Sequence, residues 1–163
     1  MSASKDRRPV NEVDRTLFRD MCARFAAAEA APRWRAADRD KAFPRDFYVA
    51  AARAGLIGIT AAPDIGGAGL GAYEEAIAME EVSKANANLA VSILVQNVAG
   101  SILYDYGSSE QREMARAVLA GDCLVAITVT EPEAGNDVQN VKTTARRDGD
   151  DWIINGSKIF STN

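Results

Sequence analysis

The apolar positions near the N-terminus recur every three to four residues, which is the period of one face of an α-helix. They predict a first helix over residues 11–31, whose apolar stripe consists of Val13, Leu17, Phe18, Met21, Cys22 and Phe25. Proline has no backbone N–H and interrupts helical hydrogen bonding, so Pro32 is expected to end this helix. The charged stretch that follows, residues 33–43, is expected to form a loop.

Further helices are predicted from the same spacing and from residues that begin or end helices, over residues 44–54, 72–84, 88–106 and 109–120. Pro44 suits the first turn of a helix, and Gly55 suits the position after its end. Gly107 is expected to stop the helix before it. Ser108 and Gln111 form the capping-box pattern that begins the last helix.

The pattern changes after Gly121 to short segments rich in β-branched residues. Asp148-Gly149-Asp150 and Asn155-Gly156 are both hairpin-turn signals. The expected strands cover residues 124–129, 141–147, 152–155 and 158–161. The predicted fold class is α+β: an all-helical bundle domain over residues 1–121, then the first strands of an incomplete β-barrel domain over residues 122–163. So short a β part buries too little surface to stand alone, and its last strand lacks a closing partner.

The stretch from Ala85 to Tyr104 carries no charge over twenty residues, which is the length of a membrane span. Six hydrogen-bonding side chains are scattered through it: Asn86, Asn88, Ser92, Gln96, Asn97 and Ser101. Lipid would leave these groups without partners. The sequence therefore predicts a buried helix of a bundle and no membrane span.

Charge and composition exclude several function classes. The chain has 19 Lys and Arg against 23 Asp and Glu, a net charge of −4, which argues against nucleic acid as a partner. It has no histidine, which excludes a Ser-His-Asp triad and an HExxH zinc site. Cys22 and Cys123 lie too far apart for a CxxC motif, and no metal site is predicted. The scarcity of cysteine and the lack of a signal peptide in Met1–Val10 favour a cytoplasmic location.

A glycine-rich stretch, Gly67-Ala68-Gly69-Leu70-Gly71-Ala72, matches a loose dinucleotide-binding pattern. That pattern also needs an acid about twenty residues later at the end of a second strand, and this chain has none there. A tight turn between helices is the favoured interpretation. The neighbouring acids Glu80 and Glu81 point to different sides of a predicted helix and are expected to be solvated.

Two segments in the β part carry the candidate chemistry. In residues 129–137 a strand ends in Thr-Glu-Pro and turns through Ala-Gly-Asn-Asp, where Gly135 permits close backbone approach to an anion. In residues 155–163, Phe160 offers an aromatic face and Thr162 a hydroxyl donor. Either segment could equally be a plain loop or strand without a ligand.

Together the two segments resemble motifs of the acyl-CoA dehydrogenase flavoenzymes. Thr130 to Asp137 matches the family's Thr-Glu-Pro-x-Ala-Gly-Ser-Asp loop, and Asn155 to Asn163 matches its Asn-Gly-x-Lys-x-Trp-Ile-Thr-Asn segment. Features of the helical part also resemble the family's N-terminal domain in the right order: Pro63, Gly67, Gly69, Glu80-Glu81, Tyr106-Gly107, Glu110-Gln111 and Gly121.

The resemblance implies a bound FAD. The residues that would contact it are Ile127, Thr128, Val129, Thr130, Asn136, Phe160, Ser161 and Thr162. Val129 and Thr130 would meet the isoalloxazine edge, Phe160 would lie against the ring, and the Thr162 hydroxyl would approach the flavin N5. Such contacts set the electronics of the cofactor.

The resemblance also implies a thioester substrate, acyl-CoA or acyl carried on a carrier. Asn136 would meet the pyrophosphate of the cofactor and the CoA part of the substrate, while Ser92, Val95 and Gln96 are candidates for the acyl pocket. Three residues depart from the family pattern: Asn136 replaces Ser, Phe160 replaces Trp, and Ile127 stands where several members have an aromatic residue. The family's catalytic base, a Glu, lies beyond the matched region, so no catalytic residue is assigned here.

The resulting hypothesis is the N-terminal part of an FAD-dependent acyl-CoA dehydrogenase-like oxidoreductase that performs α,β-dehydrogenation by hydride transfer to FAD. A C-terminal portion or a second subunit is expected to complete it, in a homo- or hetero-oligomer, and the chain alone is expected to be inactive. Two alternatives remain open. One is a non-catalytic helical interaction module, and the other is a flavin oxidase or monooxygenase of the same superfamily.

Overall fold

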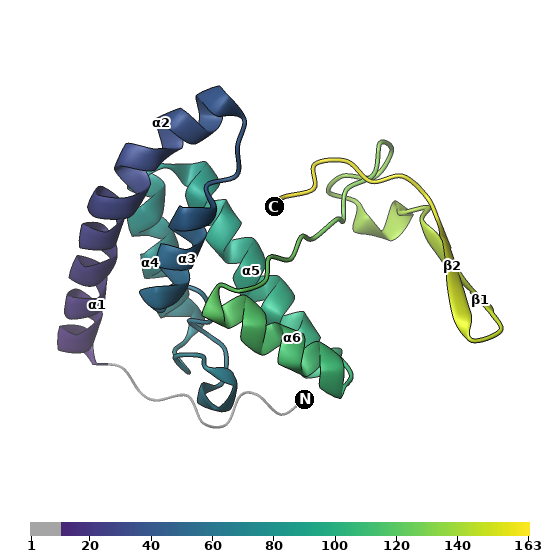
Figure 1. Ribbon diagram of the computed structural model, residues 1–163, viewed down its shortest axis with the longest axis horizontal. Helices are drawn as coiled ribbons and strands as arrows, with labels where there is room; N and C mark the ends of the chain where they lie inside the picture. The colour runs from purple at the N-terminus through teal and green to yellow at the C-terminus, as the bar shows by residue number, and fades with distance from the viewer. Residues whose placement is uncertain (1–10) are drawn as a thin grey trace. The chain divides into compact units, whose positions relative to one another are not determined.

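The computed structural model describes residues 11–163, so Met1–Val10, for which no signal peptide is predicted, lies outside the described residues. The chain forms two compact units. The first runs to Val125 and includes Asn163, and the second comprises Ala126–Thr162. Figure 1 shows helices in the first unit and a β-hairpin in the second.

The first helical stretch continues past the proline that was expected to end it. α1 (Glu12–Phe25) passes into a π-helical turn (Ala26–Ala30) and then into α2 (Ala31–Asp40). Pro32 lies in the first turn of α2, where its missing N–H costs least. The wider turn before it, in which the Ala31 N–H donates to the Ala26 carbonyl, accommodates the change of phase. The prediction that the helix ends at Pro32 is therefore wrong.

The stretch expected to be a loop, residues 33–43, is largely the helix α2. Arg33 stabilises it through a carboxylate oxygen of Glu29 one turn earlier, at 2.7 Å, and reaches Asp46 of the next helix at the same distance. The helix ends at Lys41, which takes the left-handed conformation with φ 50°. Neither a glycine nor an apolar stripe marks this exposed helix, so its sequence resembles that of a loop.

The remaining helices follow the predictions closely. α3 spans Arg45–Arg53, α4 Ala72–Ala85, α5 Ala87–Tyr106 and α6 Ser109–Ala120. The capping box that begins α6 is present: the Gln111 N–H donates to the Ser108 hydroxyl, and the Ser108 N–H donates to the Gln111 side chain. Gly55 follows α3 with φ 73°, and Gly107 ends α5.

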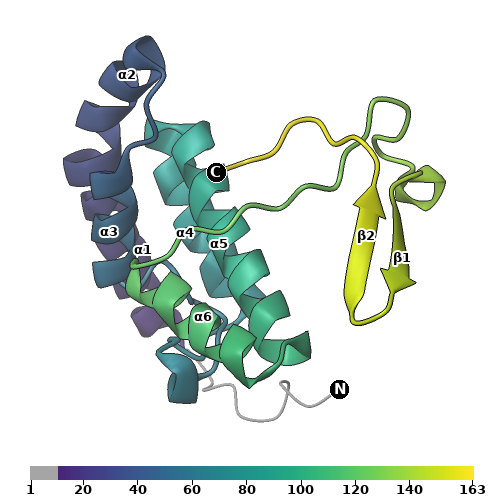
Figure 2. The ribbon, with the colours of Figure 1, turned by 45° about the vertical axis from the view of Figure 1, so that its right-hand side comes forward.

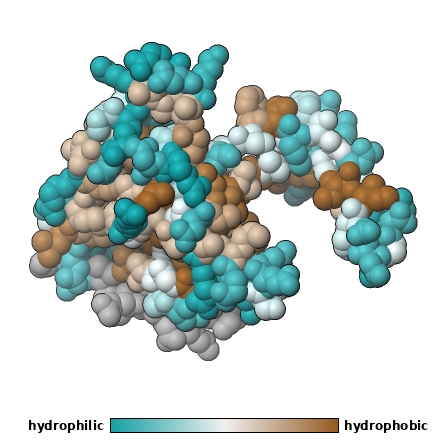
Figure 3. All heavy atoms as spheres, viewed as in Figure 1, coloured by the Kyte–Doolittle hydropathy of each residue, from teal (hydrophilic) through white to brown (hydrophobic). Residues whose placement is uncertain are grey.

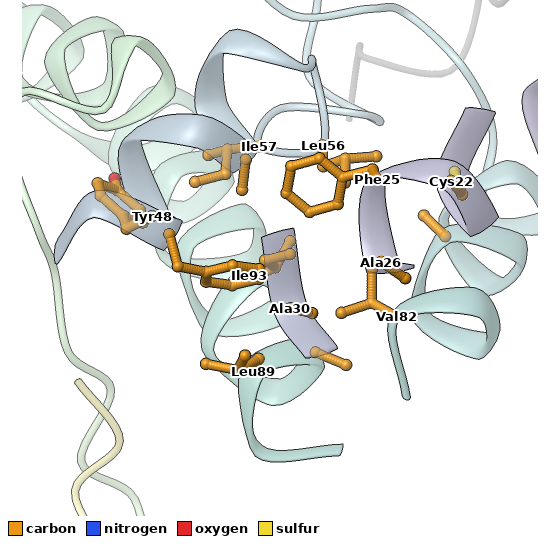
Figure 4. Close-up of a cluster of buried hydrophobic side chains, with 14 of the residues drawn as sticks. Cys22, Phe25, Ala26, Ala30, Tyr48, Leu56, Ile57, Val82, Leu89 and Ile93 are labelled. Carbon is orange, nitrogen blue, oxygen red and sulfur yellow. The ribbon is translucent and has the colours of Figure 1, made fainter. Parts of the chain in front are cut away.

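The core of the first unit lies between α1, the π-helical turn, α3, α4 and α5. Figure 4 shows the buried side chains that meet there: Cys22, Phe25, Ala26, Ala30, Tyr48, Leu56, Ile57, Val82, Leu89 and Ile93. Of the predicted apolar stripe, Cys22 and Phe25 are buried, whereas Leu17 is exposed. The side chain of Val13 lies outside what the structure describes.

Ion pairs join α1 to α4 along the edge of this core. Arg15 binds the buried Glu74 at 2.9 Å, and Arg19 binds both Glu80 and the buried Glu81. The pKa of the Glu81 carboxyl is lowered, first by its hydrogen bond from Lys84 and then by Arg19. The expectation that Glu80 and Glu81 are both solvated therefore holds for Glu80 but is wrong for Glu81.

The glycine-rich stretch is a compact turn between α3 and α4. A short 3₁₀ helix (Pro63–Ile65) comes just before it, and no strand precedes it within the described part of the chain. A Cβ on Gly67 would lie 2.1 Å from the carbonyl oxygen of Ala61, so only glycine fits there. The tight-turn interpretation is confirmed.

α5 is long and apolar enough to cross a membrane by length and composition alone, with 44% of its most apolar window buried inside the molecule. Its buried polar side chains have protein partners, as expected for a core helix. The Asn97 amide oxygen accepts the Gly58 N–H at 2.7 Å, and its nitrogen donates to Glu75 at 2.9 Å. The Ser101 hydroxyl donates to the Val98 carbonyl at 2.8 Å.

The second unit contains an antiparallel hairpin of β1 (Thr144–Asp148) and β2 (Asp151–Asn155), in which Thr144 pairs with Asn155. Figure 2 shows the two strands side by side, joined by the tight turn that Asp148-Gly149-Asp150 predicts. Figure 3 shows hydrophobic residues at the surface of this unit. Trp152 and Ile154 are among its exposed large hydrophobic residues.

Three expectations for the second unit are wrong. Residues 124–129 and 158–161 contain no strand, because β-branched residues form strands only where a partner pairs with them. Ile127 forms an isolated bridge with Thr162, which lies just beyond the second range. The dipeptide Asn155-Gly156 ends β2 and makes no hairpin. Gly156 is instead required by close packing, since a Cβ there would lie 2.2 Å from the Thr143 hydroxyl oxygen.

Candidate functional site

The structure brings the two candidate segments side by side in one antiparallel register within the second unit. Ile127 forms a bridge with Thr162, and the Ile159 N–H donates to the Thr130 carbonyl at 2.9 Å. Both pairings belong to the same alignment, so residues 127–131 face residues 158–162 in reverse order. Val129 and Phe160 therefore occupy facing positions in the register.

Side chains with aromatic, apolar and hydroxyl chemistry are accessible along this pair of segments. Phe160 is 83% exposed and Val129 is 46% exposed. Thr128 and Ser161 are exposed, while Ile127, Thr130 and Thr162 are half-buried. Phe160 has φ 55°, a left-handed conformation that bends the segment and turns it away from strand geometry. The plain-strand interpretation of residues 158–161 is therefore wrong.

Glu131 is the buried anchor between the two segments. Its side chain is 4% exposed and accepts hydrogen bonds from the Lys142 N–H at 2.6 Å, the Thr143 N–H at 2.9 Å and the Lys158 ammonium at 2.9 Å. The hydrogen bond from Lys158, with those from the backbone, lowers the pKa of this carboxyl to about 2. Glu131 is thus an ionised structural group at neutral pH.

Lys158 lies in the second segment but was not among the predicted site residues. Its ammonium also donates to the Val129 carbonyl at 2.9 Å. The available signal was the one cation of the second segment, Lys158, and the first of the three acids in the other, Glu131. Only the pairing register shows that these two charges meet.

The turn after Glu131 exposes backbone donors. Glu131 and Ala134 exchange two backbone hydrogen bonds, at 2.9 and 3.2 Å, which close a tight turn around Pro132. The N–H groups of Gly135 and Asn136 have no hydrogen-bond partner among residues 11–163. A Cβ on Gly135 would meet nothing within 4 Å, so the backbone here is open to a ligand. Neighbouring free N–H groups of this kind suit an anion.

The three acyl-pocket candidates lie on one face of α5 in the first unit. The Ser92 hydroxyl donates to the Asn163 amide oxygen at 2.6 Å, and the Asn163 amide donates to the Ser92 carbonyl at 3.1 Å. Gln96 is fully buried and bonds both backbone groups of Val125, at 2.7 and 3.0 Å. Val95 is half-buried.

Tyr48 is a second residue with a positioning role that was not predicted from the sequence. Its buried hydroxyl lies 2.8 Å from the Val118 carbonyl and 2.7 Å from the Cys123 carbonyl, and it donates to this pair. Burial raises its pKa to about 12. Tyr48 and Gln96 together fix the segment that leaves α6, and neither is free for chemistry.

Family profiles match nearly all of the described chain. The profile described as the acyl-CoA dehydrogenase N-terminal domain matches residues 12–121, and that of the acyl-CoA dehydrogenase middle domain matches residues 126–163. The chain belongs to the acyl-CoA dehydrogenase family. The profiles divide the chain between its helical part and its β part, in the order that the resemblance implied.

Curated members of the acyl-CoA dehydrogenase family resemble the chain over most of its length. It is 36% identical over 148 residues to the long-chain specific acyl-CoA dehydrogenase of Sus scrofa mitochondria, covering 90% of this chain and 34% of that protein. It is 32% identical to the isobutyryl-CoA dehydrogenase of Dictyostelium discoideum, covering 90% of this chain and 36% of that protein. The chain therefore spans about a third of the length of these relatives.

Solved structures share the fold. A glutaryl-CoA dehydrogenase from Mycobacterium smegmatis in complex with FADH2 matches with a TM-score of 0.85 and 26% identity, over 93% of this chain and 39% of that one. The FAD complex of PigA matches with a TM-score of 0.80 and 26% identity, over 96% of this chain and 42% of that one.

Proposed function

We propose that this chain is the N-terminal part of an FAD-dependent oxidoreductase that dehydrogenates an acyl thioester between its α and β carbons. Family membership supports the reaction class, and relatives named acyl-CoA dehydrogenases support the substrate class. Because the chain spans about a third of those relatives, a further portion or a second subunit completes the enzyme in this proposal. The proposed location is the cytoplasm, and the proposed assembly is an oligomer.

The observation that carries the proposal is the antiparallel pairing of residues 127–131 with residues 158–162. It places an exposed aromatic ring, two threonine hydroxyls and open backbone donors within one small unit. An isoalloxazine ring presents an aromatic face and a polar edge, so this set of groups fits FAD. FAD, when bound, would accept the hydride from the β carbon.

In this proposal the cofactor is contacted by Ile127, Thr128, Val129, Thr130, Phe160, Ser161 and Thr162. Phe160 would lie against the ring, and its high exposure leaves the face available. The Thr162 hydroxyl would donate to the ring near N5. Asn136, with the free N–H groups beside it, would meet the pyrophosphate and the CoA part of the substrate, where an amide replaces the family's usual hydroxyl.

The acyl chain would lie beside α5. Half-buried Val95 offers apolar surface for it. Ser92 and Gln96 are already engaged in hydrogen bonds, so in this proposal they stabilise the helix surface that contacts the acyl chain. The acid that removes the α proton would come from outside this chain. Glu131 does not suit that role, because its low pKa and its three hydrogen bonds make it a weak base.

A flavin oxidase or monooxygenase of the same superfamily is the second candidate. One solved structural neighbour is described as PigA with FAD and proline, so the shared fold also occurs in a protein studied with a ligand that is not a thioester. The groups present in this chain serve either reaction.

The test is to purify the chain together with its completing portion and to record the visible absorption spectrum. Flavin absorbance that bleaches when an acyl-CoA is added without oxygen supports dehydrogenation. Flavin that bleaches only with a substrate other than a thioester supports the second candidate. A colourless, stable complex that cannot be loaded with FAD would favour a non-catalytic interaction module.

A further inference from the structure

The ammonium group of Lys158 makes two contacts that together define the position of one peptide group. It donates to the Val129 carbonyl at 2.9 Å and to a Glu131 carboxylate oxygen at 2.9 Å, and its side chain is 24% exposed. Both acceptors lie in the first of the two paired segments, whereas Lys158 lies in the second. The Lys158 ammonium therefore links the two paired segments. Its contacts lie next to the backbone of residues 129–130, which is proposed to contact the flavin.

The carbonyl that Lys158 binds determines where the next N–H points. A trans peptide is planar, so the Val129 carbonyl and the Thr130 N–H point in opposite directions. Thr130 uses its own carbonyl to accept from Ile159, but its N–H has no hydrogen-bond partner among residues 11–163. Lys158 thus draws the carbonyl to one side and presents an open donor on the other.

Glu131 determines where the ammonium lies. Its carboxylate is fixed by the N–H groups of Lys142 and Thr143, at 2.6 and 2.9 Å, just before β1. A lysine on a flexible stem carries considerable rotamer entropy, so a buried anion that holds its ammonium removes that freedom before any ligand binds. The donor at Thr130 is pre-organised in this way.

We propose that Lys158 is a positioning residue that orients the Thr130 N–H toward an acceptor atom on the polar edge of the flavin ring. This inference rests on the proposed function, because it concerns the same cofactor site. Lys158 itself touches no cofactor atom. It acts through the Val129–Thr130 peptide.

The test compares Lys158→Met, Lys158→Arg and the matched control Lys142→Met. Lys142 is exposed and lies in the same unit, and only its backbone N–H takes part in the network. In the 163-residue chain without cofactor, the Thr130 amide resonance is expected to shift in Lys158→Met and to stay in place in Lys142→Met. In the completed flavoprotein, Lys158→Met should weaken FAD binding about tenfold and alter the flavin absorption bands.

Arginine also donates to two acceptors, so Lys158→Arg should restore the absorption bands and bring FAD affinity within about threefold of the unmodified protein. A Lys158→Met protein with an unshifted Thr130 amide and unchanged flavin bands would overturn the proposal. If Lys158→Met loses the cross-strand contacts between β1 and β2, Lys158→Gln replaces it. Glutamine keeps a polar side chain but is one atom shorter than lysine, so the Thr130 amide is expected to shift in this variant too.

The two readouts separate this inference from the function on which it rests. A completed protein that binds no FAD would contradict the proposed function, while the Thr130 amide shift would still decide whether Lys158 orients the peptide. Bound FAD with bands that Lys158→Met leaves unchanged would contradict only the positioning role.

Discussion

At the scale of single residues, Glu131 shows how one buried carboxylate can organise a loop. Its three hydrogen bonds tie the turn after the first segment to the start of β1 and to Lys158. A buried carboxylate needs such partners, since an unpaired one would be too costly to keep. Glu131 is therefore the structural centre of the second unit.

The low pKa of Glu131 predicts acid sensitivity of the hairpin. Its folded pKa of about 2 lies below the ordinary value of 4.5, so the ionised form stabilises the fold. That contribution is present above pH 4.5 and is lost as the pH falls from 4.5 toward 2. The amide signals of β1 and β2 should therefore lose protection across this range, as measured by NMR during acid titration.

Glu131→Gln should remove most of this pH dependence and lower stability at neutral pH. The exposed Glu133→Gln is the control and should leave the titration of the hairpin as it is. An acid transition of the hairpin that is identical in Glu131→Gln would show that another group controls it.

The half-buried Thr162 gives a second prediction at this scale. Thr162→Val keeps the side-chain shape and removes the hydroxyl that is proposed to donate near the flavin N5. Flavin reduction by substrate in the completed enzyme should slow about tenfold or more, since about 1.4 kcal/mol corresponds to a factor of ten. Stopped-flow absorbance measures this rate, and Ser161→Ala at the exposed neighbouring position serves as the comparison. Unaltered reduction kinetics in Thr162→Val would refute the assignment.

At the scale of elements, the helices were predictable where local chemistry specifies them. Ser108 with Gln111 begins α6 through side chains within one turn, so the sequence contains the whole signal. The same holds for the turn at Gly149. The continuation through Pro32 was not predictable, because a π-helical turn depends on how the surrounding helices pack.

The strands and the site contacts depend on distant partners, which explains the remaining errors. Residues 124–129 have β-branched side chains, but only one bridge pairs them among the described residues. Lys158 and Glu131 are separated by 27 positions, and no local pattern joins them. Both candidate segments could be found from sequence, whereas the contacts that align them could not.

Gln96 on α5 gives a prediction at this scale. Its amide satisfies both the N–H and the carbonyl of Val125 in the segment that leaves the helical unit. Gln96→Leu keeps the volume and leaves these groups without their partners, which should cost at least about 1 kcal/mol. Urea unfolding followed by circular dichroism measures the change. Asn88→Ala, at an exposed position of the same helix, should unfold at the same urea concentration as the unmodified chain. If Gln96→Leu unfolds at the same urea concentration as the unmodified chain and Asn88→Ala, the structural role of Gln96 is contradicted.

At the scale of the whole molecule, the second unit presents more apolar surface than its own contacts cover. Trp152 is 63% exposed and Ile154 is 73% exposed, on a hairpin that pairs with no further strand in residues 11–163. Exposed apolar side chains and open strand edges of this kind are normally covered by neighbouring structure. The two candidate segments, residues 127–131 and 158–162, lie in the same unit as this hairpin.

The last prediction follows from this exposure. The 163-residue chain alone should neither retain FAD through gel filtration nor bleach it on addition of an acyl-CoA. Two short segments must offset several kcal/mol of lost ligand freedom before any affinity results. Glu131 does not suit the role of base, because its low pKa and its three hydrogen bonds make its carboxylate a weak proton acceptor. Adding the completing portion should restore both properties together. Tight, stoichiometric FAD with substrate-dependent bleaching in the chain alone would show instead that residues 127–131 and 158–162 suffice for the site and that the base lies within this chain.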